Sequence, residues 1–291
     1  MLYLDADATR AALSMSAAIE AMVPAFSDDR ETPLRNLLGV SLFMSGRVGT
    51  STGVKVVSTV PGKPFGVLAV FDGEGACRGL IHGPTLTAIR TAAGAGLATR
   101  YLARPDSRTM AMLGAGAMAY DQVMAVKEVR PILDVLVWSR DPSNAEMLAE
   151  RIDGTAVDDP ADAVSEADVV STATPSREPL FAADTVRAGT HLNAVGAFTP
   201  EMCEIPPDIV QAARVVVDDA GASLAEAGDL LQAGVDPSTT MADLIHGREK
   251  GRTNDDEITL FKSVGIASQD VAAGMTALQT AEARGLGTQL D

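Results

Sequence analysis

The sequence predicts an α/β protein in which a Rossmann-type, doubly wound parallel sheet is joined to a smaller α+β domain. Three observations carry this prediction. A glycine turn, Gly114-Ala115-Gly116-Ala117, joins an apolar run to a helix-length segment. Further apolar runs recur after it between helix-length segments, as strands of a buried parallel sheet do. The first 105 residues instead carry shorter, alternating segments separated by glycine turns.

The glycine turn has the spacing Gly114-x-Gly116-x-x-Ala119 and follows the apolar residues 109–113. Such a turn brings a strand to the N-terminus of a helix, where exposed N–H groups and the helix dipole favour a pyrophosphate. By itself the string is weak, because it also occurs in ordinary turns of alanine- and glycine-rich chains. A second apolar run at 134–138 completes a βαβ unit, so redox chemistry on a nicotinamide becomes the leading hypothesis.

Three later runs extend the predicted sheet. They lack polar alternation, which is typical of strands that are buried on both faces. They cover residues 167–174, 190–196 and 214–218.

The end of the second predicted strand indicates which nicotinamide is bound. A site for NAD usually places a carboxylate there to accept hydrogen bonds from the ribose 2′-hydroxyl. Here Ser139 and Arg140 follow the strand, and a hydroxyl and a guanidinium bind a 2′-phosphate. We therefore expect NADP(H) in preference to NAD(H). The alternative is that Arg140 is a solvated loop residue and that Asp141 binds the ribose.

The remaining segments of the sequence predict the strands and helices of the first domain. Glycine-rich residues 72–75 predict a hairpin turn. We expect strands at 40–44, 53–60, 66–71 and 77–82, and helices at 14–28 and 84–102. The apolar tail at 258–283 is expected to be helical and to pack on this domain. The predicted domains are 1–105 with 266–291, and 106–265.

Composition excludes several classes of protein. The net charge of −16 argues against nucleic acid and against anionic membrane surfaces as partners. No run of about 18 apolar residues predicts a membrane span. The start of the sequence lacks the basic and apolar regions of a signal peptide. Two cysteines are too few for a disulfide framework, and three scattered histidines give no metal-ligand spacing. A cytoplasmic protein without a metal is expected.

Three basic residues stand in apolar or glycine-rich surroundings, which is unusual in so acidic a chain. Lys55 alternates with Val54 and Val56, so it faces the opposite side of its strand. Arg90 lies in a helix start made of small residues, and Arg35 precedes the first strand of the hairpins. If the three converge they would bind a carboxylate, and their mutual repulsion would lower the pKa of the lysine. The alternative for each is a solvated surface charge.

Along nearly its whole length the chain resembles the ornithine cyclodeaminase/mu-crystallin family. The order and spacing of the matching segments are more specific than any one of them. They are Pro33-Leu34-Arg35, Gly53-Val54-Lys55-Val56-Val57, Leu86-Thr87-Ala88-Ile89-Arg90-Thr91-Ala92-Ala93, Gly114-Ala115-Gly116, Asp168-Val169-Val170-Ser171-Thr172-Ala173-Thr174, Asn193-Ala194-Val195-Gly196-Ala197, Glu226-Ala227-Gly228-Asp229-Leu230 and Ile258-Thr259-Leu260-Phe261-Lys262-Ser263-Val264-Gly265.

The resemblance implies a homodimer whose N-terminal sheets associate, and a first domain that binds substrate and forms the dimer. It also implies a Rossmann domain with the nucleotide in the interdomain cleft. Arg35, Lys55 and Arg90 match positions near the substrate carboxylate and the reacting carbon. With Arg90, the positions implied for the nucleotide are Thr91, Gly114, Gly116, Ala117, Met118, Thr172, Thr174, Val195, Gly196 and Ser263.

One departure from the family pattern narrows the expected activity. Ornithine cyclodeaminases and related alanine dehydrogenases carry an aspartate after Asn-Ala-Val-Gly, where this chain has Phe198. Phenylalanine can neither take a proton nor bind an ammonium group. The replacement resembles the imine-reductase branch of the family, which reduces cyclic ketimines such as Δ1-pyrroline-2-carboxylate or Δ1-piperideine-2-carboxylate to proline or pipecolate.

The chemistry implied is hydride transfer from NADPH to a carboxylate-bearing C=N carbon. Arg35 and Arg90 would hold the carboxylate, Phe198 would form an apolar wall, and the catalytic Lys55 or bound water would supply a proton. Three alternatives stay open. The chain could be an ornithine cyclodeaminase or alanine dehydrogenase that uses a different acid. It could act on a larger amino-acid imine, or it could be a non-catalytic NADP(H)-binding protein.

Overall fold

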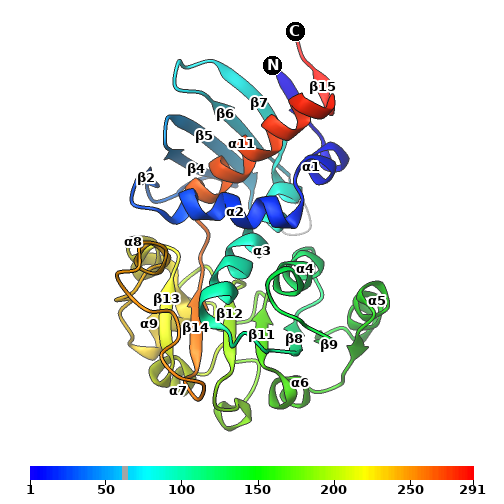
Figure 1. Ribbon diagram of the computed structural model, residues 1–291, viewed down its shortest axis with the longest axis vertical. Helices are drawn as coiled ribbons and strands as arrows, with labels where there is room; N and C mark the ends of the chain where they lie inside the picture. Colours follow the sequence, from blue (N-terminus) through cyan, green and yellow to red (C-terminus); the bar gives the residue numbers. More distant parts are fainter. Residues whose placement is uncertain (61–64) are drawn as a thin grey trace. The chain divides into compact units, whose positions relative to one another are not determined.

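The computed structural model describes residues 1–60 and 65–291 (Figure 1). Its contacts divide the chain into two units, Met1–Ala93 with Ile266–Asp291, and Gly94–Gly265. The predicted boundary at residue 105 lies beyond the end of α3 (Gly83–Leu102), whereas the contact boundary falls inside that helix. The C-terminal boundary lies between residues 265 and 266 in both descriptions.

The second unit, in which every residue is described, is built on a seven-stranded sheet whose strands all run parallel. Its order is β10-β9-β8-β11-β12-β14-β13, so the order reverses direction between β8 and β11, as in a doubly wound sheet. The predicted fold class is confirmed. The strands are β8 (Thr109–Leu113), β9 (Asp134–Trp138), β10 (Thr155–Ala156), β11 (Val169–Thr172), β12 (His191–Ala194), β13 (Arg214–Val217) and β14 (Thr259–Lys262).

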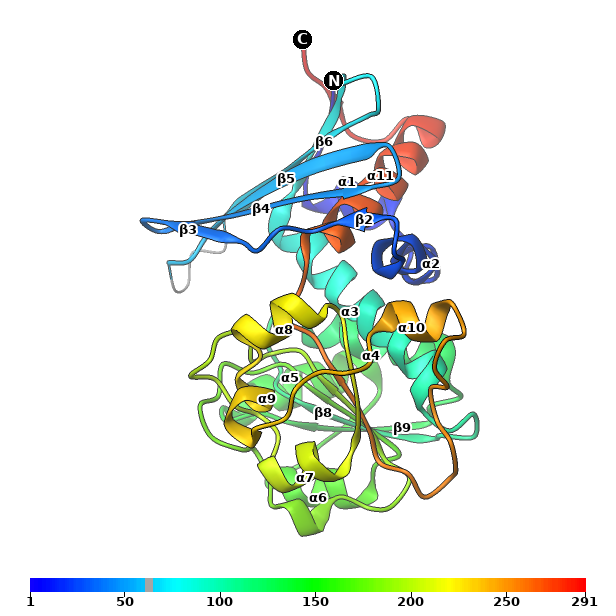
Figure 2. The same cartoon turned by 90° about the vertical axis from the view of Figure 1, so that its left-hand side faces the viewer.

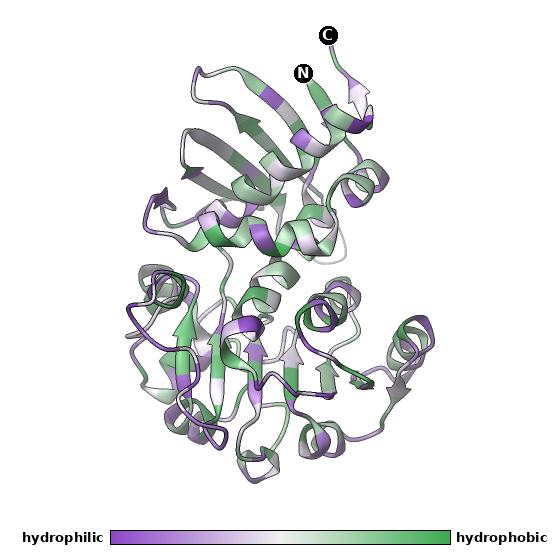
Figure 3. Cartoon of the chain, in the orientation of Figure 1, coloured by the Kyte–Doolittle hydropathy of each residue, from purple (hydrophilic) through white to green (hydrophobic). Residues whose placement is uncertain are grey.

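The central strands β8, β11, β12 and β14 are almost entirely buried, as strands covered on both faces are. Several strands are mostly green in Figure 3, whereas β12 and the helices α4, α5 and α6 mix green residues with purple ones. Two of these helices begin in the same way: Asp141 and Asp159 accept a backbone N–H as N-caps, and a proline follows each at the first helical position. The helical segments are α4 (Ala119–Val129), α5 (Pro142–Ile152), α6 (Pro160–Glu166), η1 (Ala183–Thr185), α7 (Pro207–Ala212), α8 (Ala220–Glu226), α9 (Gly228–Ala233) and α10 (Met241–Ile245).

The expectation of one helix over residues 258–283 was wrong. Residues Thr259–Lys262 form β14, which inserts between β12 and β13, and the helix α11 starts only at Ala267. Periodicity cannot separate a short buried strand from the first turn of an apolar helix. β13 is therefore the edge strand, and β14 separates it from β12.

The described residues of the first unit form an eight-stranded mixed sheet with the order β15-β1-β7-β6-β5-β4-β2, and β3 pairs with β4. Helices α1, α2 and α11 lie on one side of it (Figure 2). Its elements are β1 (Leu2–Leu4), α1 (Ala6–Ala12), α2 (Met15–Phe26), β2 (Arg30–Glu31), β3 (Asn36–Leu38), β4 (Ser41–Val48), β5 (Ser51–Ser58), β6 (Gly66–Phe71), β7 (Cys77–His82), α11 (Ala267–Arg284) and β15 (Thr288–Gln289).

Side chains alternate between the two faces of β5, and this alternation determines which of them are buried. Lys55 pairs in register with Met44 and Leu68, and all three are buried on the helix-covered face. Val54 and Val56 are only half-buried on the other face. The prediction that Lys55 faces away from its two valine neighbours is confirmed, and the side it faces is the core.

The start of α11 passes very close to β4 at Gly46. A Cβ at this position would lie 3.0 Å from the backbone carbon of Ala267 and 3.0 Å from the backbone nitrogen of Ser268. Backbone atoms cannot move aside as a flexible side chain can. Glycine at this position therefore fixes how closely the first turn of α11 approaches the sheet.

We predict that Gly46→Val lowers the free energy of unfolding by about 1–3 kcal/mol, because the added side chain overpacks the contact with α11. Urea unfolding measures this change. Ser45→Val is the matched control, since it places the same side chain on the exposed face of the neighbouring position. Equal stability of the two variants would contradict the close approach.

Candidate functional site

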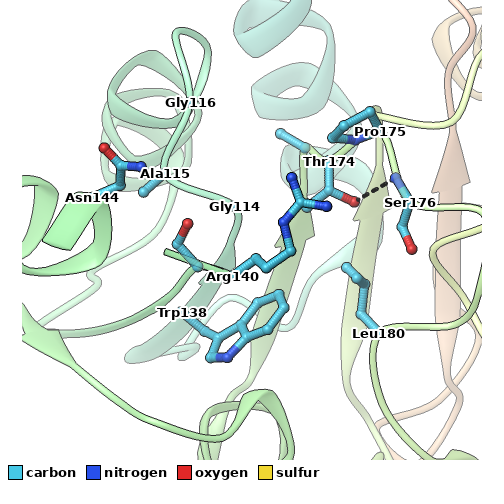
Figure 4. A pocket seen from close by; sticks show the side chains of 12 residues that line it. Gly114, Ala115, Gly116, Trp138, Arg140, Asn144, Thr174, Pro175, Ser176 and Leu180 are labelled. Atoms are coloured by element: carbon cyan, nitrogen blue, oxygen red, sulfur yellow. Dashed lines mark hydrogen bonds between the residues drawn. The ribbon is translucent and has the colours of Figure 1, made fainter. Parts of the chain in front are cut away.

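The second unit has a pocket of about 350 Å³ at the carboxyl ends of its parallel strands. Its walls come from the segments that follow β8, β9 and β11, the place where the strand order reverses. Open α/β sheets bind their ligands at such a switch point. Figure 4 shows the lining residues, which are Gly114, Ala115, Gly116, Trp138, Ser139, Arg140, Asn144, Ala173, Thr174, Pro175, Ser176 and Leu180.

The glycine turn has the geometry that a bound nucleotide needs. Gly114 has a φ of +106°, and a Cβ there would lie 2.8 Å from the carbonyl oxygen of Ala173. Glycine is therefore required for both the conformation and the close approach to β11. Directly after the turn α4 begins at Ala119, and the N-cap Met118 offers no side chain to its first N–H groups. The residues present thus fit the pyrophosphate of a dinucleotide.

Arg140 lies where the sequence analysis expected a phosphate ligand. Figure 4 shows its side chain extending across the pocket toward Thr174 and Pro175. The neighbouring Asp141 is engaged elsewhere, since its Oδ1 accepts hydrogen bonds from the backbone N–H and the hydroxyl of Ser143 at the start of α5. A carboxylate used as an N-cap is poorly placed to bind a ribose as well.

A buried carboxylate supports the loops beside this pocket. Glu204 accepts hydrogen bonds from the backbone N–H of Thr174 at 2.6 Å and its hydroxyl at 2.8 Å, and from the backbone N–H groups of Gly196 and Ala197. Burial raises the pKa of Glu204, and Lys262 opposes that effect. Glu204 thus fastens together the segments that follow β11 and β12.

Glu204 is tied in turn to a buried ion pair. Its backbone N–H donates to Asp229, and Asp229 pairs with the ammonium of Lys262 at 2.7 Å. Lys262 also donates to the carbonyl oxygen of Ala197. The resemblance included Asp229 and Lys262 among matching segments without giving either a role. Their pairing was not visible in the sequence because the two residues come from different elements.

The predicted nucleotide residues of this unit fall into two groups. Gly114, Gly116, Ser139, Arg140 and Thr174 line the pocket. The others are not among its lining residues: Ala117 is exposed, Met118 is half-buried, and Thr172, Val195, Gly196 and Ser263 are buried. The hydroxyl of Ser263 donates to Asp218 at 2.7 Å. Their roles toward a nucleotide stay predictions.

Two of the three predicted cations of the first unit, Lys55 and Arg90, meet at a carboxylate that was not predicted from the sequence. Lys55 Nζ lies 2.8 Å from each carboxylate oxygen of Asp270 and 3.3 Å from the hydroxyl of Thr87. Arg90 Nε donates to the same carboxylate at 2.9 Å. These contacts join β5, α3 and α11 at a buried point, and Asp270 is fully buried. We call Lys55, Arg90 and Asp270 the buried triad.

Arg35 lies close enough to Lys55 for its charge to affect the pKa of the lysine. The pKa of Lys55 is lowered to about 8, mainly by burial and also by the charges of Arg90 and Arg35, while the carboxylate of Asp270 opposes these effects. Arg35, which is only partly buried, precedes β3. Lys55 and Arg90 therefore converge on Asp270, and the binding of a carboxylate by the three cations stays a prediction. Thr91 is buried beside Arg90 in α3.

Phe198 lies in the loop that follows β12, two residues beyond Gly196. Its side chain is 42% exposed, and the loop is held by Glu204 and Lys262 through Ala197. A partly exposed aromatic residue on a fastened loop is suitable as a pocket wall. Its role toward a substrate stays a prediction.

Among the described residues, no helix is both long enough and apolar enough to cross a membrane.

A family model described as the ornithine cyclodeaminase/mu-crystallin family matches residues 42–284. The chain is 34% identical to a Δ1-pyrroline-2-carboxylate reductase of Bacillus cereus, and the match spans all of both chains.

Solved structures give the same result. The chain is similar to a Thermococcus litoralis Δ1-pyrroline-2-carboxylate reductase in complex with NADH and L-proline, with a TM-score of 0.94 and 32% identity over all of both chains. It is also similar to an archaeal alanine dehydrogenase dimer with bound NAD, with a TM-score of 0.92 and 28% identity, over 100% of this chain and 99% of the other.

Proposed function

Because the chain belongs to the ornithine cyclodeaminase/mu-crystallin family, we propose that it is an NAD(P)H-dependent reductase of a cyclic α-imino acid. The substrate is Δ1-pyrroline-2-carboxylate or Δ1-piperideine-2-carboxylate, and the product is proline or pipecolate. The observation that carries this proposal is the buried triad with Arg35 beside it, on a chain that matches an imine reductase over its full length.

The residues of the first unit suit such a substrate. Arg35 and Arg90 present guanidinium groups that bind a carboxylate and orient the molecule. Lys55 is a proton donor whose pKa of about 8 suits work near neutral pH. A bound nicotinamide in its reduced form would supply the hydride, and the turn at Gly114 with Arg140 would hold its phosphates.

The carboxylates near these cations do not favour the alternative of a cyclodeaminase or alanine dehydrogenase. Those activities would need another acid to do the work of the family's aspartate, because this chain has Phe198 at that position. Asp270 has both oxygens against buried Lys55, and one of them also accepts from Arg90. Because both of its oxygens are taken up by Lys55 and Arg90, Asp270 is not placed to act as that acid.

A panel of substrates tests the proposed function. We expect NADPH to be consumed with either cyclic imine, and we expect no reduction of NAD(P)⁺ with ornithine or alanine. Lys55→Met should lower the rate by about 10²–10⁴-fold, the usual contribution of a general acid. Lys127→Met, in α4 of the other unit, is the matched lysine control.

Each other outcome of the panel identifies an alternative. Ammonia release from ornithine or alanine without imine reduction would favour the deaminating enzymes. NADPH binding without turnover of any of these compounds would favour a non-catalytic protein.

We also propose that NADP(H) is preferred to NAD(H). Arg140 and Ser139 line the pocket, and Asp141 is engaged as the N-cap of α5. The related structures contain NADH or NAD, so the preference rests on residues of this chain.

We expect Arg140→Ala to raise the KM for NADPH by about 10- to 100-fold, as the loss of a charged hydrogen bond worth about 1.5–3 kcal/mol requires. The KM for NADH should stay the same, because NADH lacks the 2′-phosphate. Arg108→Ala removes the same charge from the opposite end of β8 and serves as control. A parallel change in both KM values would refute the assignment of Arg140.

A homodimer formed by the sheets of the first unit is part of the proposal. The sheet face opposite α11 carries apolar side chains that are incompletely buried, among them Val54, Val56 and Val67. Exposed apolar faces of this kind mark interfaces. A cytoplasmic location is also proposed, and cell fractionation tests it.

Sedimentation should therefore give twice the chain mass of 30.1 kDa. Val56→Asp should yield monomers, because it places a charge in the interface. Gln279→Asp, on the exposed side of α11, should leave the dimer intact. A monomeric parent protein would rule out this arrangement.

A further inference from the structure

Asp270 stands at a point where two buried cations meet. Its side chain is 0% exposed, and the side chains of Lys55 and Arg90 are 2% and 6% exposed. Burying two like charges together is unfavourable unless a counter-charge with good geometry lies between them. Asp270 supplies that counter-charge with contacts of 2.8 Å and 2.9 Å.

We propose that Asp270 is the positioning residue of this site, holding Lys55 and Arg90 on one carboxylate and keeping Lys55 protonated as the donor to the substrate nitrogen. The role in proton transfer rests on the proposed function. The coupling of Asp270 to Lys55 does not, and it can be measured without any substrate.

The start of α11 holds Asp270 rigidly in place. The backbone N–H of Ile266 donates to Gln269 Oε1, which also accepts from Arg90 at 3.2 Å. The hydroxyl of Ser268 donates to the carbonyl oxygen of Ala25 in α2. These bonds fix the first turn of the helix, so the carboxylate is oriented before any ligand arrives.

The surroundings of Lys55 make its proton depend on Asp270. Arg90 approaches from α3 and Arg35 from the segment before β3, and both charges oppose the ammonium, as does burial. The neighbours across the sheet, Met44 and Leu68, are apolar. Asp270 alone among the charges acting on Lys55 favours the ammonium. Without Asp270, burial and the charges of Arg90 and Arg35 would act on Lys55 unopposed, and its pKa would fall further.

A reduced nicotinamide, when bound, would supply a hydride to the imine carbon, and the π electrons of the C=N bond would move to nitrogen. Lys55 gives that nitrogen its proton when the imine arrives unprotonated. The lysine is left neutral beside Asp270 and regains a proton from water.

Lysine NMR tests this coupling directly. The chain has five lysines, so protein labelled at the lysine ε-carbons gives few signals, and Lys55→Met identifies the one from Lys55. We expect this signal to titrate near pH 8 in the parent protein. In Asp270→Asn its midpoint should fall by at least about one pH unit, because an opposite charge is lost. Glu282→Gln removes a surface carboxylate of the same helix and should leave the midpoint unchanged.

A variant that should shift the midpoint of Lys55 in the opposite direction provides a second test if Asp270→Asn fails to fold. Arg90→Gln removes a like charge, so the midpoint of Lys55 should rise. Asp270→Glu should retain a midpoint close to that of the parent. The proposal would be overturned if the midpoint of Lys55 were unchanged in both Asp270→Asn and Arg90→Gln. It would also be overturned if that midpoint lay near pH 10 in the parent protein.

Kinetics separate this proposal from the proposed function. If Lys55 is the donor, kcat/KM for the cyclic imine should fall above about pH 8 in the parent protein and at correspondingly lower pH in Asp270→Asn. The value of kcat/KM falls as the pH rises because only the protonated form of Lys55 can donate a proton. A normal NMR response without imine reduction would refute the proposed function alone. If the fall of kcat/KM at high pH does not shift together with the NMR midpoint of Lys55, the donor role of Lys55 is refuted.

Discussion

A single buried carboxylate organises the first unit. Asp270 lies where α3, α11 and β5 meet, and it balances two cations that the apolar interior would otherwise reject. The counter-charge at that point explains why a lysine at a core-facing position of β5 is tolerated. The first turn of the same helix passes close to β4, where a Cβ at Gly46 would lie 3.0 Å from backbone atoms of α11.

The second unit uses the same device for a different purpose. There Lys262, Asp229 and Glu204 form a buried chain of charges at the carboxyl end of the parallel sheet. Their contacts bind the loops after β11 and β12 to each other, so that the wall of the pocket and the loop with Phe198 share one support. Buried charge in both units thus acts on the geometry of neighbouring residues, which hydrophobic packing alone specifies less sharply.

Local patterns in the sequence predicted most of the fold. The unalternating runs predicted the parallel strands, the glycine spacing predicted the turn at Gly114, and the period of two placed Lys55 opposite its valine neighbours. The run at 259–262 was misread because four apolar-rich residues before a helix resemble its first turn. Asp270 and Glu204 were missed for another reason. Each gains its importance from partners distant in sequence, and neither is marked by any local spacing.

The first unit is assembled from both ends of the chain. Its sheet begins with β1 near the N-terminus, yet β15 pairs with that strand and α11 covers the sheet only when residues 266–291 are present. During synthesis on the ribosome the N-terminal strands therefore emerge long before the helix that completes them. The second unit, by contrast, is finished earlier because its segment is continuous. Lys55 therefore meets its counter-ion Asp270, 215 residues later in the chain, only after α11 has been synthesised.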